Sequence, residues 1–388
     1  MTRPLRVALD VAALRLPESG IGRYTSSLLT ALAVAFPEDE WSGFIAGLGA
    51  PDIEVPAGVT LGRLRVPRRV LQWGWSSFGW PSVETATGKI DVFHTSDWSH
   101  PPHRGRATVT TVHDLGPLDH PEWYTTDIVE RHRQQNAATV ERADLVIAIS
   151  EFTKRRLLQH FDIGEDRVVV VPNGVSSDFT AEPSGTEHQT EDRYGTSRPY
   201  LLYVGTAEPR KNLSGLLRIF ERVAQQESEL DLVMVGPTPG QAQDSVHGVE
   251  AWTSDPVEAA REPSVLRSRV RQLGAVPRGD LFDLYRGAVA LLHPTFYEGF
   301  GLPLLEAMAS GCPVLSASTS AVPEVVGEAG FLADPSDEET FAEMALRALA
   351  DPEALAASRA AGLERASDYT WERTARATRA AYTRAVGD

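Results

Sequence analysis

The sequence predicts an α/β protein of two domains, each built on a doubly wound parallel sheet. Short apolar runs typical of buried strands alternate with helical segments along the chain, and this alternation favours parallel sheets. A stretch rich in Ser, Thr, Glu, Pro and Gly, residues 179–199, interrupts the pattern and is interpreted as an interdomain linker. The 388 residues, 42% of them hydrophobic, are enough for two cores of ordinary size.

The first half begins with a buried strand at residues 5–10, followed by a helix that Gly20 and Gly22 open and that runs to about Ala35. The glycines form G-x-G-x-x-T about ten residues after the strand, so the dinucleotide fingerprint is not met. A flexible glycine start to a helix is the plain alternative to a phosphate-facing loop. Further strands are expected at residues 41–46, 90–94, 107–112, 143–150 and 167–172.

His113 follows directly after the apolar run 107–112. Ligands of open α/β sheets gather at the carboxyl ends of the strands, so this position would make His113 face a cleft. A structural histidine, satisfied within the fold, is the competing interpretation.

The second half opens with a strand at residues 199–205 and a loop that carries Arg210 and Lys211 before a helix at 213–226. Two cations beside a helix N-terminus suit a diphosphate, since arginine can hold two oxygens and lysine acts as a point charge. The chain has only three lysines, so one at this corner is informative. A solvated pair of basic residues is the alternative.

Glu298 and Glu306 flank another strand-to-helix corner. Residues 289–292 should be a buried strand, 298–301 a tight loop, and 302–310 a helix with Pro303 in its first turn. The backbone N–H groups at that helix start favour an anion. A phosphate flanked by carboxylates that accept hydroxyl hydrogen bonds would suit a nucleotide-sugar, although glycine loops of this kind are also common without a ligand.

Composition excludes several classes of function. The net charge of −16 argues against general nucleic-acid binding, and no run of about 18 apolar residues predicts a membrane span. The first residues lead straight into a strand without the features of a signal peptide, and the single cysteine, Cys312, is expected to be a buried structural thiol. These observations favour the cytoplasm.

Residues 63–75 mix four arginines with apolar and aromatic side chains. One interpretation is an interfacial patch that approaches a lipid-linked acceptor, with peripheral contact at the inner face of the membrane. The other is a surface helix whose Val70, Leu71 and Trp73 face the core.

The run from His293 to Val314 closely resembles the E-x7-E segment of the retaining glycosyltransferases of family 4, in which two Rossmann-like domains face each other across a cleft (the GT-B fold). Val112-His-Asp-Leu115, Gly205-Thr-Ala-Glu-Pro-Arg-Lys-Asn212 and, more weakly, Gly20-Ile-Gly22 resemble other segments of the family. The resemblance implies an acceptor-side domain at residues 1–180 and a nucleotide-sugar domain at 198–369. A last helix, about 370–388, would cross back to the first domain.

Roles for single residues follow from the resemblance. It implies that His113 hydrogen-bonds the donor sugar, that Glu306 holds the ribose hydroxyls, and that Glu298 holds the sugar or approaches its anomeric face. Arg210 and Lys211 would bind the diphosphate, although Thr206 stands where some relatives carry a further arginine. Other expected donor contacts come from Gly20, Gly22, Gly205, Val276, Gly299, Phe300, Gly301 and Leu302.

The sequence as a whole therefore predicts a bacterial, retaining glycosyltransferase that moves a hexose from a nucleotide-sugar. GDP-mannose is favoured, with a glycan, a lipid-linked or a small-molecule acceptor, as in polysaccharide assembly. No Asp-x-Asp pair stands at a strand end, so neither a metal nor a cofactor is expected. The alternatives are a natural-product glycosyltransferase that uses a UDP- or dTDP-sugar, and a non-catalytic scaffold of the same fold.

Overall fold

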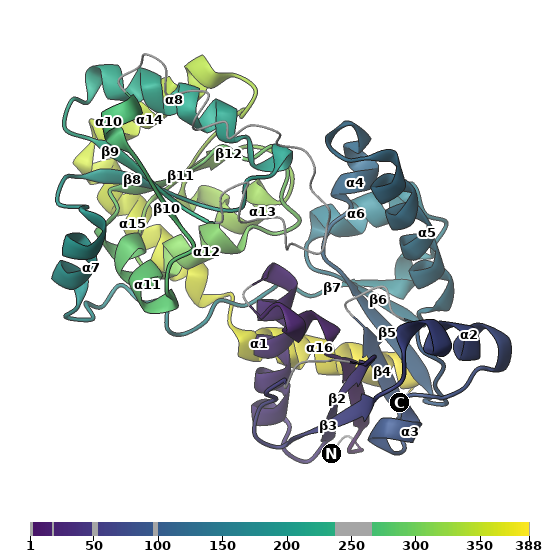
Figure 1. The fold of residues 1–388 in the computed structure, drawn as a ribbon. Coiled ribbons are helices and arrows are strands. Elements are labelled where there is room, and N and C mark those ends of the chain that lie inside the picture. Colours follow the sequence, from purple (N-terminus) through teal and green to yellow (C-terminus); the bar gives the residue numbers. More distant parts are fainter. Residues whose placement is uncertain (1–2, 18, 49–52, 96–99, 237–265, 388) are drawn as a thin grey trace. The chain divides into compact units, whose positions relative to one another are not determined.

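The computed structural model describes residues 3–17, 19–48, 53–95, 100–236 and 266–387. The chain divides into two compact units (Figure 1). The first comprises Met1–Leu115, Arg131–Gly174 and Trp371–Asp388, and the second Gly116–Glu130 and Val175–Thr370. This division differs from the predicted one, because the segment 116–130 goes with the second unit.

The first unit is built on a seven-stranded sheet in the order β3-β2-β1-β4-β5-β6-β7, and every neighbouring pair is parallel. The predicted parallel sheet is confirmed, but β3 was not predicted, since its sequence alternates half-buried residues around Gly62. The strands are β1 (Arg6–Asp10), β2 (Glu40–Ala46), β3 (Val59–Leu64), β4 (Val92–Thr95), β5 (Ala107–Val112), β6 (Leu145–Ala148) and β7 (Val168–Val170).

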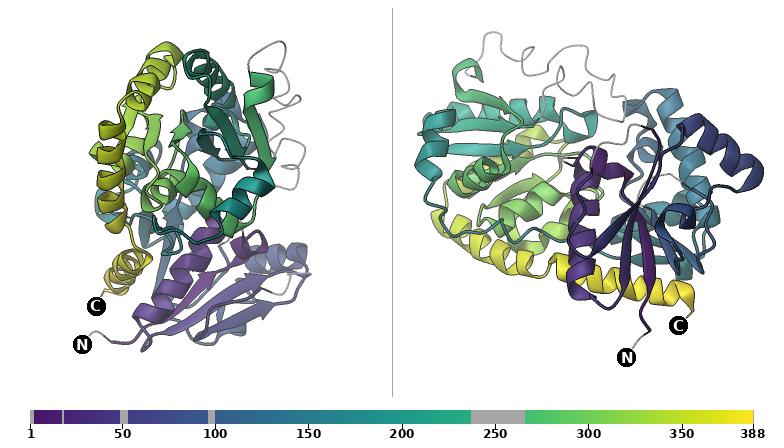
Figure 2. Two further views of the ribbon diagram at one scale, coloured as in Figure 1. Left: turned by 90° about the vertical axis from the view of Figure 1, so that its left-hand side faces the viewer. Right: turned by 60° about the horizontal axis from the view of Figure 1, so that its bottom comes forward.

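Two long helices, α1 (Gly20–Ala35) and α16 (Trp371–Val386), cross in contact with each other on one face of this sheet (Figure 2). The last helix therefore belongs to the first unit, as predicted. Leu71 of α2 and Val83, just before α3, pack against the other face. The remaining helices of this half of the sequence are α2 (Arg68–Phe78), α3 (Glu84–Thr87), α4 (Gly116–Asp119), α5 (Thr126–Arg142), α6 (Glu151–His160) and the 3₁₀ turns η1 (Ala12–Arg15), η2 (Pro121–Trp123) and η3 (Glu165–Arg167).

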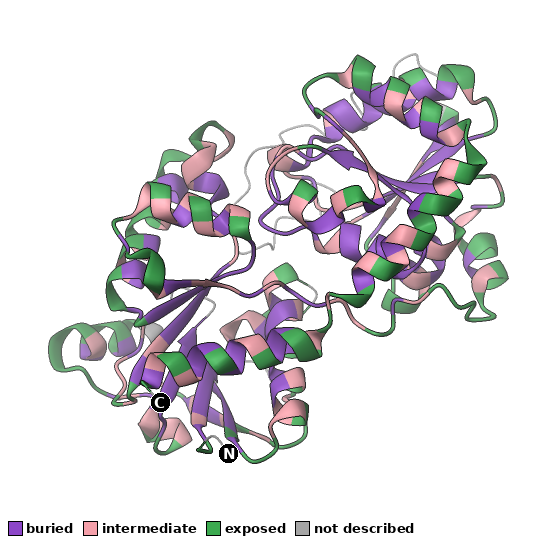
Figure 3. Ribbon diagram, turned by 180° about the vertical axis from the view of Figure 1, so that it is seen from behind, coloured by how far each residue is buried: buried purple, intermediate pink, exposed green. Residues whose placement is uncertain are grey.

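The second unit has a six-stranded parallel sheet in the order β10-β9-β8-β11-β12-β13. The strands of both units are largely buried (Figure 3). The strands are β8 (Tyr200–Val204), β9 (Asp231–Val235), β10 (Val270–Gly274), β11 (Ala290–His293), β12 (Val314–Ala317) and β13 (Phe331–Ala333). The helices are α7 (Glu187–Tyr194), α8 (Leu213–Gln226), α10 (Leu266–Arg269), α11 (Arg278–Gly287), α12 (Leu302–Ala309), α13 (Val322–Val326), α14 (Glu338–Leu349), α15 (Pro352–Ser367), η4 (Pro209–Lys211) and η6 (Gly327–Ala329).

One expectation about a segment needs correction. The stretch 179–199 is not simply a linker, because it contains helix α7, and the buried carboxylate of Asp283 on α11 accepts hydrogen bonds from Ser184 (2.8 Å) and Thr190 (2.7 Å). Polar composition suggested a loop, but these hydrogen bonds fasten the segment to the second unit. The sequence also predicts a long polar loop at residues 237–263, and this segment lies outside the described residues.

Strand order shows where a ligand would meet the second sheet. The order reverses between β8 and β11, because the chain goes outward from β8 through β9 to β10 and then returns to the other side as β11. In open α/β sheets, ligands bind beyond the carboxyl ends of strands at such a switch point. The loops that follow β8 and β11 carry Arg210, Lys211 and Glu298.

Candidate functional site

The loops after β8 and β11 are fastened together by their backbones. Asn212 lies in the left-handed region at φ 55°, caps α8 by accepting from the Gly215 N–H, and donates to the carbonyl of Pro294 (3.0 Å). The carbonyl of Arg210 accepts from the Phe296 N–H (2.8 Å) and from the Thr295 hydroxyl (2.9 Å). Two predicted segments that lie far apart in the sequence therefore form one corner.

The buried carboxylate of Glu298 lies at the centre of this corner. One oxygen accepts hydrogen bonds from the Lys211 ammonium and from Nε2 of His293 (2.9 Å). The other accepts from Nη1 of Arg210 (3.2 Å). Both predicted cations thus meet the first glutamate of the E-x7-E segment, and His293 is a further member that the sequence reasoning did not select.

These contacts fix the charge of Glu298. Burial alone would raise the pKa of this carboxyl, but the Lys211 charge, the His293 hydrogen bond and the Arg210 charge outweigh it and hold the pKa far below the ordinary 4.5. Burial, helped by the Arg210 charge, lowers the pKa of Lys211, and Glu298 and Glu208 oppose this effect. Glu298 is therefore an ionised group that holds two cations in place.

Arg210 is shared between two carboxylates. Its Nε donates to Glu208 (2.7 Å), whose other oxygen accepts the hydroxyl of Thr206. Burial would raise the pKa of Glu208, but the charges of Arg210 and Lys211 lower it. Thr206 stands where some relatives carry a further arginine. Here its hydroxyl orients Glu208, and Glu208 in turn holds Arg210.

His293 is the buried last residue of β11, and its ring stacks on Tyr203 with centroids 5.6 Å apart. Burial lowers its pKa, against the influence of Glu298, so the ring is neutral at physiological pH. A neutral ring whose Nε2 donates to Glu298 leaves Nδ1 as an acceptor. Its position at a strand's carboxyl end, five residues before Glu298, was the signal that could have selected it.

The turn into α12 depends on Gly301. Its φ is 97°, and a Cβ there would lie 2.7 Å from Cδ1 of Leu304. The Glu298 N–H is held by Oγ of Ser320 (3.0 Å), while Phe300 is buried against Tyr369. Gly299 and Leu302 continue this turn, and the helix after it begins with Pro303 in its first turn, as predicted.

Glu306, the second glutamate, is buried in α12, where one of its oxygens accepts a hydrogen bond from the Tyr285 hydroxyl at 3.1 Å. Tyr285 belongs to α11 and is fully buried. The sequence reasoning missed it, because a tyrosine in an amphipathic helix is indistinguishable from a core residue by pattern.

Gly205 and Val276 also follow strands of this sheet. Gly205 comes directly after β8, and a Cβ on Gly236 would lie only 1.9 Å from the Gly205 carbonyl oxygen, so this contact requires a glycine at position 236. Val276 is half-buried in the loop between β10 and α11. β9 separates its strand from β8.

A segment from earlier in the chain packs against the loop that precedes Glu298. The Tyr297 hydroxyl donates to Asp119 at 2.8 Å, and Trp123 stacks on Phe296 with centroids 6.0 Å apart. These contacts lie within the second unit, and they explain why residues 116–130 belong to it. None of these four residues was selected from the sequence.

In the first unit, His113 lies at the carboxyl end of β5, beside the ring of Tyr24 at 4.7 Å in an edge-on arrangement. Burial lowers the pKa of His113 to about 4, and its Nε2 is buried without a hydrogen-bond partner among the described residues. A buried acceptor or donor without a partner is unusual in a purely structural histidine.

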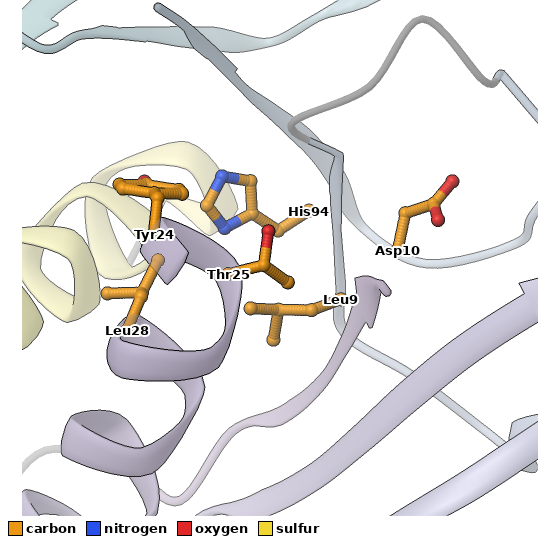
Figure 4. Close-up of a pocket in the computed structure, with 6 residues that line it drawn as sticks. All are labelled: Leu9, Asp10, Tyr24, Thr25, Leu28 and His94. Carbon is orange, nitrogen blue, oxygen red and sulfur yellow. The ribbon is translucent and has the colours of Figure 1, made fainter. Parts of the chain in front are cut away.

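A buried chain of hydrogen bonds lies behind Tyr24. The Tyr24 hydroxyl is hydrogen-bonded to the hydroxyl of Thr111 (2.9 Å), and Thr111 is hydrogen-bonded to Nε2 of His94 (2.8 Å). Nδ1 of His94 is hydrogen-bonded to the hydroxyl of Tyr382 on α16 (2.6 Å). Figure 4 shows the rings of Tyr24 and His94 close together, with Asp10 pointing away. The sequence reasoning selected none of these residues.

Gly20 and Gly22 lie in the first turn of α1. Ser19 caps this helix by accepting from the Gly22 N–H at 3.0 Å, and a Cβ on Gly22 would lie 2.3 Å from the Leu16 carbonyl oxygen. Gly22 is thus required by the close approach of backbone, whereas space around Gly20 is open. Gly20, Gly22 and His113 lie in the first unit, and the other predicted site residues lie in the second.

Two further findings concern the described part of the chain only. No group of three or more His, Cys, Asp or Glu residues there is arranged to hold a metal ion. None of its helices is both long enough and apolar enough to cross a bilayer.

Comparison with known proteins gives two matching family models. Residues 20–179 match Glycosyltransferase Family 4, and residues 186–365 match Glycosyl transferases group 1. O-antigen chain mannosyltransferase B of Escherichia coli is 29% identical over 97% of this chain and 99% of its own. A D-inositol 3-phosphate glycosyltransferase of Thermobifida fusca is 29% identical over 77% of this chain and 71% of its own.

Solved structures share the fold. Sucrose-phosphate synthase from Thermosynechococcus elongatus superposes with a TM-score of 0.75 at 22% identity, over 98% of this chain and 99% of that one. Anabaena HepE in complex with UDP-glucose gives a TM-score of 0.71 at 16% identity, over 98% and 99%. The predicted fold of two Rossmann-like domains is confirmed.

Proposed function

The chain belongs to the glycosyltransferases that combine a family 4 domain with a group 1 domain, and from this premise we propose that it transfers mannose from GDP-mannose, with retention of configuration, to a hydroxyl of a lipid-linked glycan. The observation that carries the proposal is the corner of Arg210, Lys211 and Glu298 at the switch point of the second sheet. The similarity to an O-antigen mannosyltransferase supports the choice of sugar and acceptor class.

The corner would offer two fixed cations to a nucleoside diphosphate, and the carboxylates of Glu208 and Glu298 balance their charge. Departure of the leaving group places negative charge on the phosphates, and fixed cations in a buried setting stabilise such charge more than water does. Arg210 and Lys211 would supply the cations, and the N–H groups at the start of α12, beside Gly301, would add a positive dipole end.

Glu298 acts on the donor by holding and orienting. Its three hydrogen-bond donors and depressed pKa make it a weak general base at neutral pH, since it has little tendency to take up a proton. In the proposal Glu298 fixes the two cations before the donor arrives and contributes to the orientation of the sugar.

The nucleotide end of the donor would meet Glu306, whose carboxylate accepts the ribose hydroxyls while Tyr285 orients it. Backbone groups of Gly205, Val276 and the turn 299–302 would complete the contacts with base, sugar and phosphate. In the first unit, the free Nε2 of His113 would hydrogen-bond the sugar, with Gly20 and Gly22 presenting backbone toward phosphate.

In the proposed reaction no protein side chain forms a covalent bond with the sugar. The acceptor hydroxyl attacks the anomeric carbon from the face that the diphosphate leaves, and the departing phosphate oxygen takes the hydroxyl proton. Arg210 and Lys211 would take the role that a divalent metal has in other transferases, so the proposal requires neither a metal nor a cofactor.

The test is donor turnover by the whole chain with GDP-mannose, UDP-glucose, UDP-N-acetylglucosamine and a dTDP-deoxysugar, each with and without a chelator. We expect GDP-mannose to be used, with the chelator having no effect and the product retaining its anomeric configuration by NMR. Turnover of none of these donors, together with no thermal stabilisation by GDP, would contradict the proposal. Activity that a chelator abolishes and a divalent metal restores would remove the metal-free part.

A further inference from the structure

Helix α2 and the residues after it expose an unusual amount of aromatic surface. Among the large hydrophobic residues that the described structure leaves exposed, the aromatic ones are Trp73 (62%), Phe78 (69%) and Trp80 (65%). Val70 on the same helix is also 51% exposed. The expectation that Val70 and Trp73 face the core is therefore wrong, and of that set only Leu71 is buried.

The exposure results from how α2 is anchored. Leu71 packs into the small core on this face of the first sheet, and the ring nitrogen of Trp75 donates to the Pro81 carbonyl at 2.9 Å. With Leu71 and Trp75 facing inward, Trp73 lies on the opposite side of the helix, and Phe78 is the last residue of the helix, so neither ring is covered. The exposed rings of Trp73 and Phe78 contact each other edge-on at 5.1 Å.

The chain returns past the helix end in a way that adds Trp80 to the same surface. Gly79 ends α2 in the left-handed region at φ 59°. A Cβ on Gly74 would lie 2.5 Å from the Trp80 carbonyl oxygen, so a glycine is needed for the chain to fold back there. We call Val70, Trp73, Phe78 and Trp80 the aromatic face.

The surroundings of the aromatic face are basic in a strongly acidic protein. The net charge of the chain is −16, yet no aspartate or glutamate occurs between Glu54 and Glu84, a stretch that includes four arginines. Two of these arginines, Arg65 and Arg69, are exposed. Such a local reversal of sign favours an anionic partner.

We propose that the aromatic face is a docking surface for an anionic phospholipid bilayer. Tryptophan rings favour the boundary between headgroups and acyl chains, and arginines beside them pair with lipid phosphates. A neutral protein partner would leave the basic surroundings unexplained, whereas a bilayer of anionic lipid uses both features. A lipid-linked acceptor would then be met at that surface, and this consequence alone rests on the proposed function.

The experiment is co-sedimentation of the whole chain with vesicles, in the absence of any donor. We expect binding to equimolar phosphatidylglycerol and phosphatidylcholine, and much weaker binding to phosphatidylcholine alone. The triple variant Trp73→Ser, Phe78→Ser, Trp80→Ser should bind the anionic vesicles about tenfold more weakly or worse, because it lacks the three rings that the bilayer would partly bury on binding. Arg65→Ser with Arg69→Ser should weaken binding at low salt and show a smaller salt dependence than wild type.

A matched control is available elsewhere on the surface. Val34 is 77% exposed on α1, which packs on the opposite face of the first sheet from α2, so Val34→Ser removes an exposed apolar side chain away from the aromatic face and should bind as wild type. Circular dichroism checks that every variant is folded. The proposal is overturned if wild type does not bind anionic vesicles or if the triple variant binds unchanged. A concentration-dependent dimer in sedimentation velocity that the triple variant abolishes would assign the face to self-association instead.

Discussion

The ammonium group of Lys211 donates a hydrogen bond to the carboxylate of Glu298, and both side chains are buried. The two residues come from loops after β8 and β11, on either side of the switch point in the second sheet. A buried pair of this kind is a weak source of net stability, because desolvation offsets most of the attraction. Its presence in the corner is better explained by the position in which it holds the Lys211 ammonium beside Arg210.

Replacing Lys211 by alanine should reduce kcat/KM for the donor by about a hundredfold or more, because one of two cations facing the leaving group is lost. The free energy of unfolding should fall by about 3 kcal/mol, the lower part of the range for breaking a buried pair, since Arg210 and His293 still hold Glu298. Donor kinetics and denaturant unfolding measure the two effects.

Lys154 offers a matched control for this variant. It is a lysine of α6 in the first unit, and its ion pair with Glu165 (3.1 Å) is largely solvated on the glutamate side. Lys154→Ala should leave kcat/KM within about twofold of wild type, and its effect on unfolding should be small. If Lys211→Ala behaves as Lys154→Ala does, the assignment of Lys211 to the leaving group is wrong.

Glu298→Gln should alter the acid side of the stability profile. The pKa of Glu298 is lower in the folded state than its ordinary 4.5, so its ionised form stabilises the fold above that pH. This contribution is lost progressively as the pH falls below about 4.5 toward the folded-state value. The free energy of unfolding of Glu298→Gln should therefore depend less steeply on pH below 4.5 than that of wild type. The measurement is urea unfolding at several pH values between 3 and 5. If the free energy of unfolding changes with pH equally steeply in the variant and in wild type, the assignment is contradicted.

Much of the fold was predictable because apolar strand runs and glycine or proline boundaries are local signals. The predicted strand at 107–112 and the helix from Gly20 match β5 and α1 closely. Strand β3 was not predicted, because it is a half-exposed edge strand without an apolar run. Helix α7 was not predicted, because its sequence is polar and the hydrogen bond from Thr190 to Asp283 on another helix holds it in place.

The site was predictable in part for the same reason. Arg210 and Lys211 were selected as cations beside a helix N-terminus, and Glu298 as a carboxylate at a strand-to-helix corner, and the structure brings these three together. His293 and Tyr285 were not selected, because their importance lies in the partner that each contacts across the fold. Sequence patterns indicate the edge of the sheet but not which side chains from different elements meet there.

His113→Gln should change the dependence of the unfolding free energy on pH, and it should do so at higher pH than Glu298→Gln does. Burial lowers the pKa of His113 from 6.5 to about 4, so the unfolded chain takes up a proton between these values that the folded chain does not. Stability therefore falls as the pH drops from 6.5 to 4, by up to about 1.4 kcal/mol per pH unit for one histidine. Glutamine does not titrate, so the unfolding free energy of the variant should change less steeply with pH between 4 and 6.5, by the contribution of about one proton.

The same variant separates the proposed sugar contact from a structural role. His113→Gln keeps a hydrogen-bonding side chain, whereas His113→Ala removes it, so the alanine variant should lose about tenfold or more in kcat/KM and glutamine should restore part of this. Both variants should unfold at similar denaturant concentrations at pH 8, where His113 is neutral. Equal activity of the two variants, both matching wild type, would exclude His113 from the donor site.

Tyr285→Phe tests the assignment of Glu306 to the nucleotide. The change removes only the hydroxyl that donates to Glu306, so the carboxylate loses one orienting hydrogen bond and the ring stays in place. A bond of this kind contributes about 0.5–1.5 kcal/mol, so GDP should bind about two- to tenfold more weakly, as measured by calorimetry. Tyr200→Phe is the matched control, because Tyr200 is also buried and its hydroxyl donates to the Leu284 carbonyl at 2.8 Å. Both variants should lose similar stability, but only Tyr285→Phe should weaken GDP binding, and equal nucleotide affinity in the two would remove Glu306 from the ribose site.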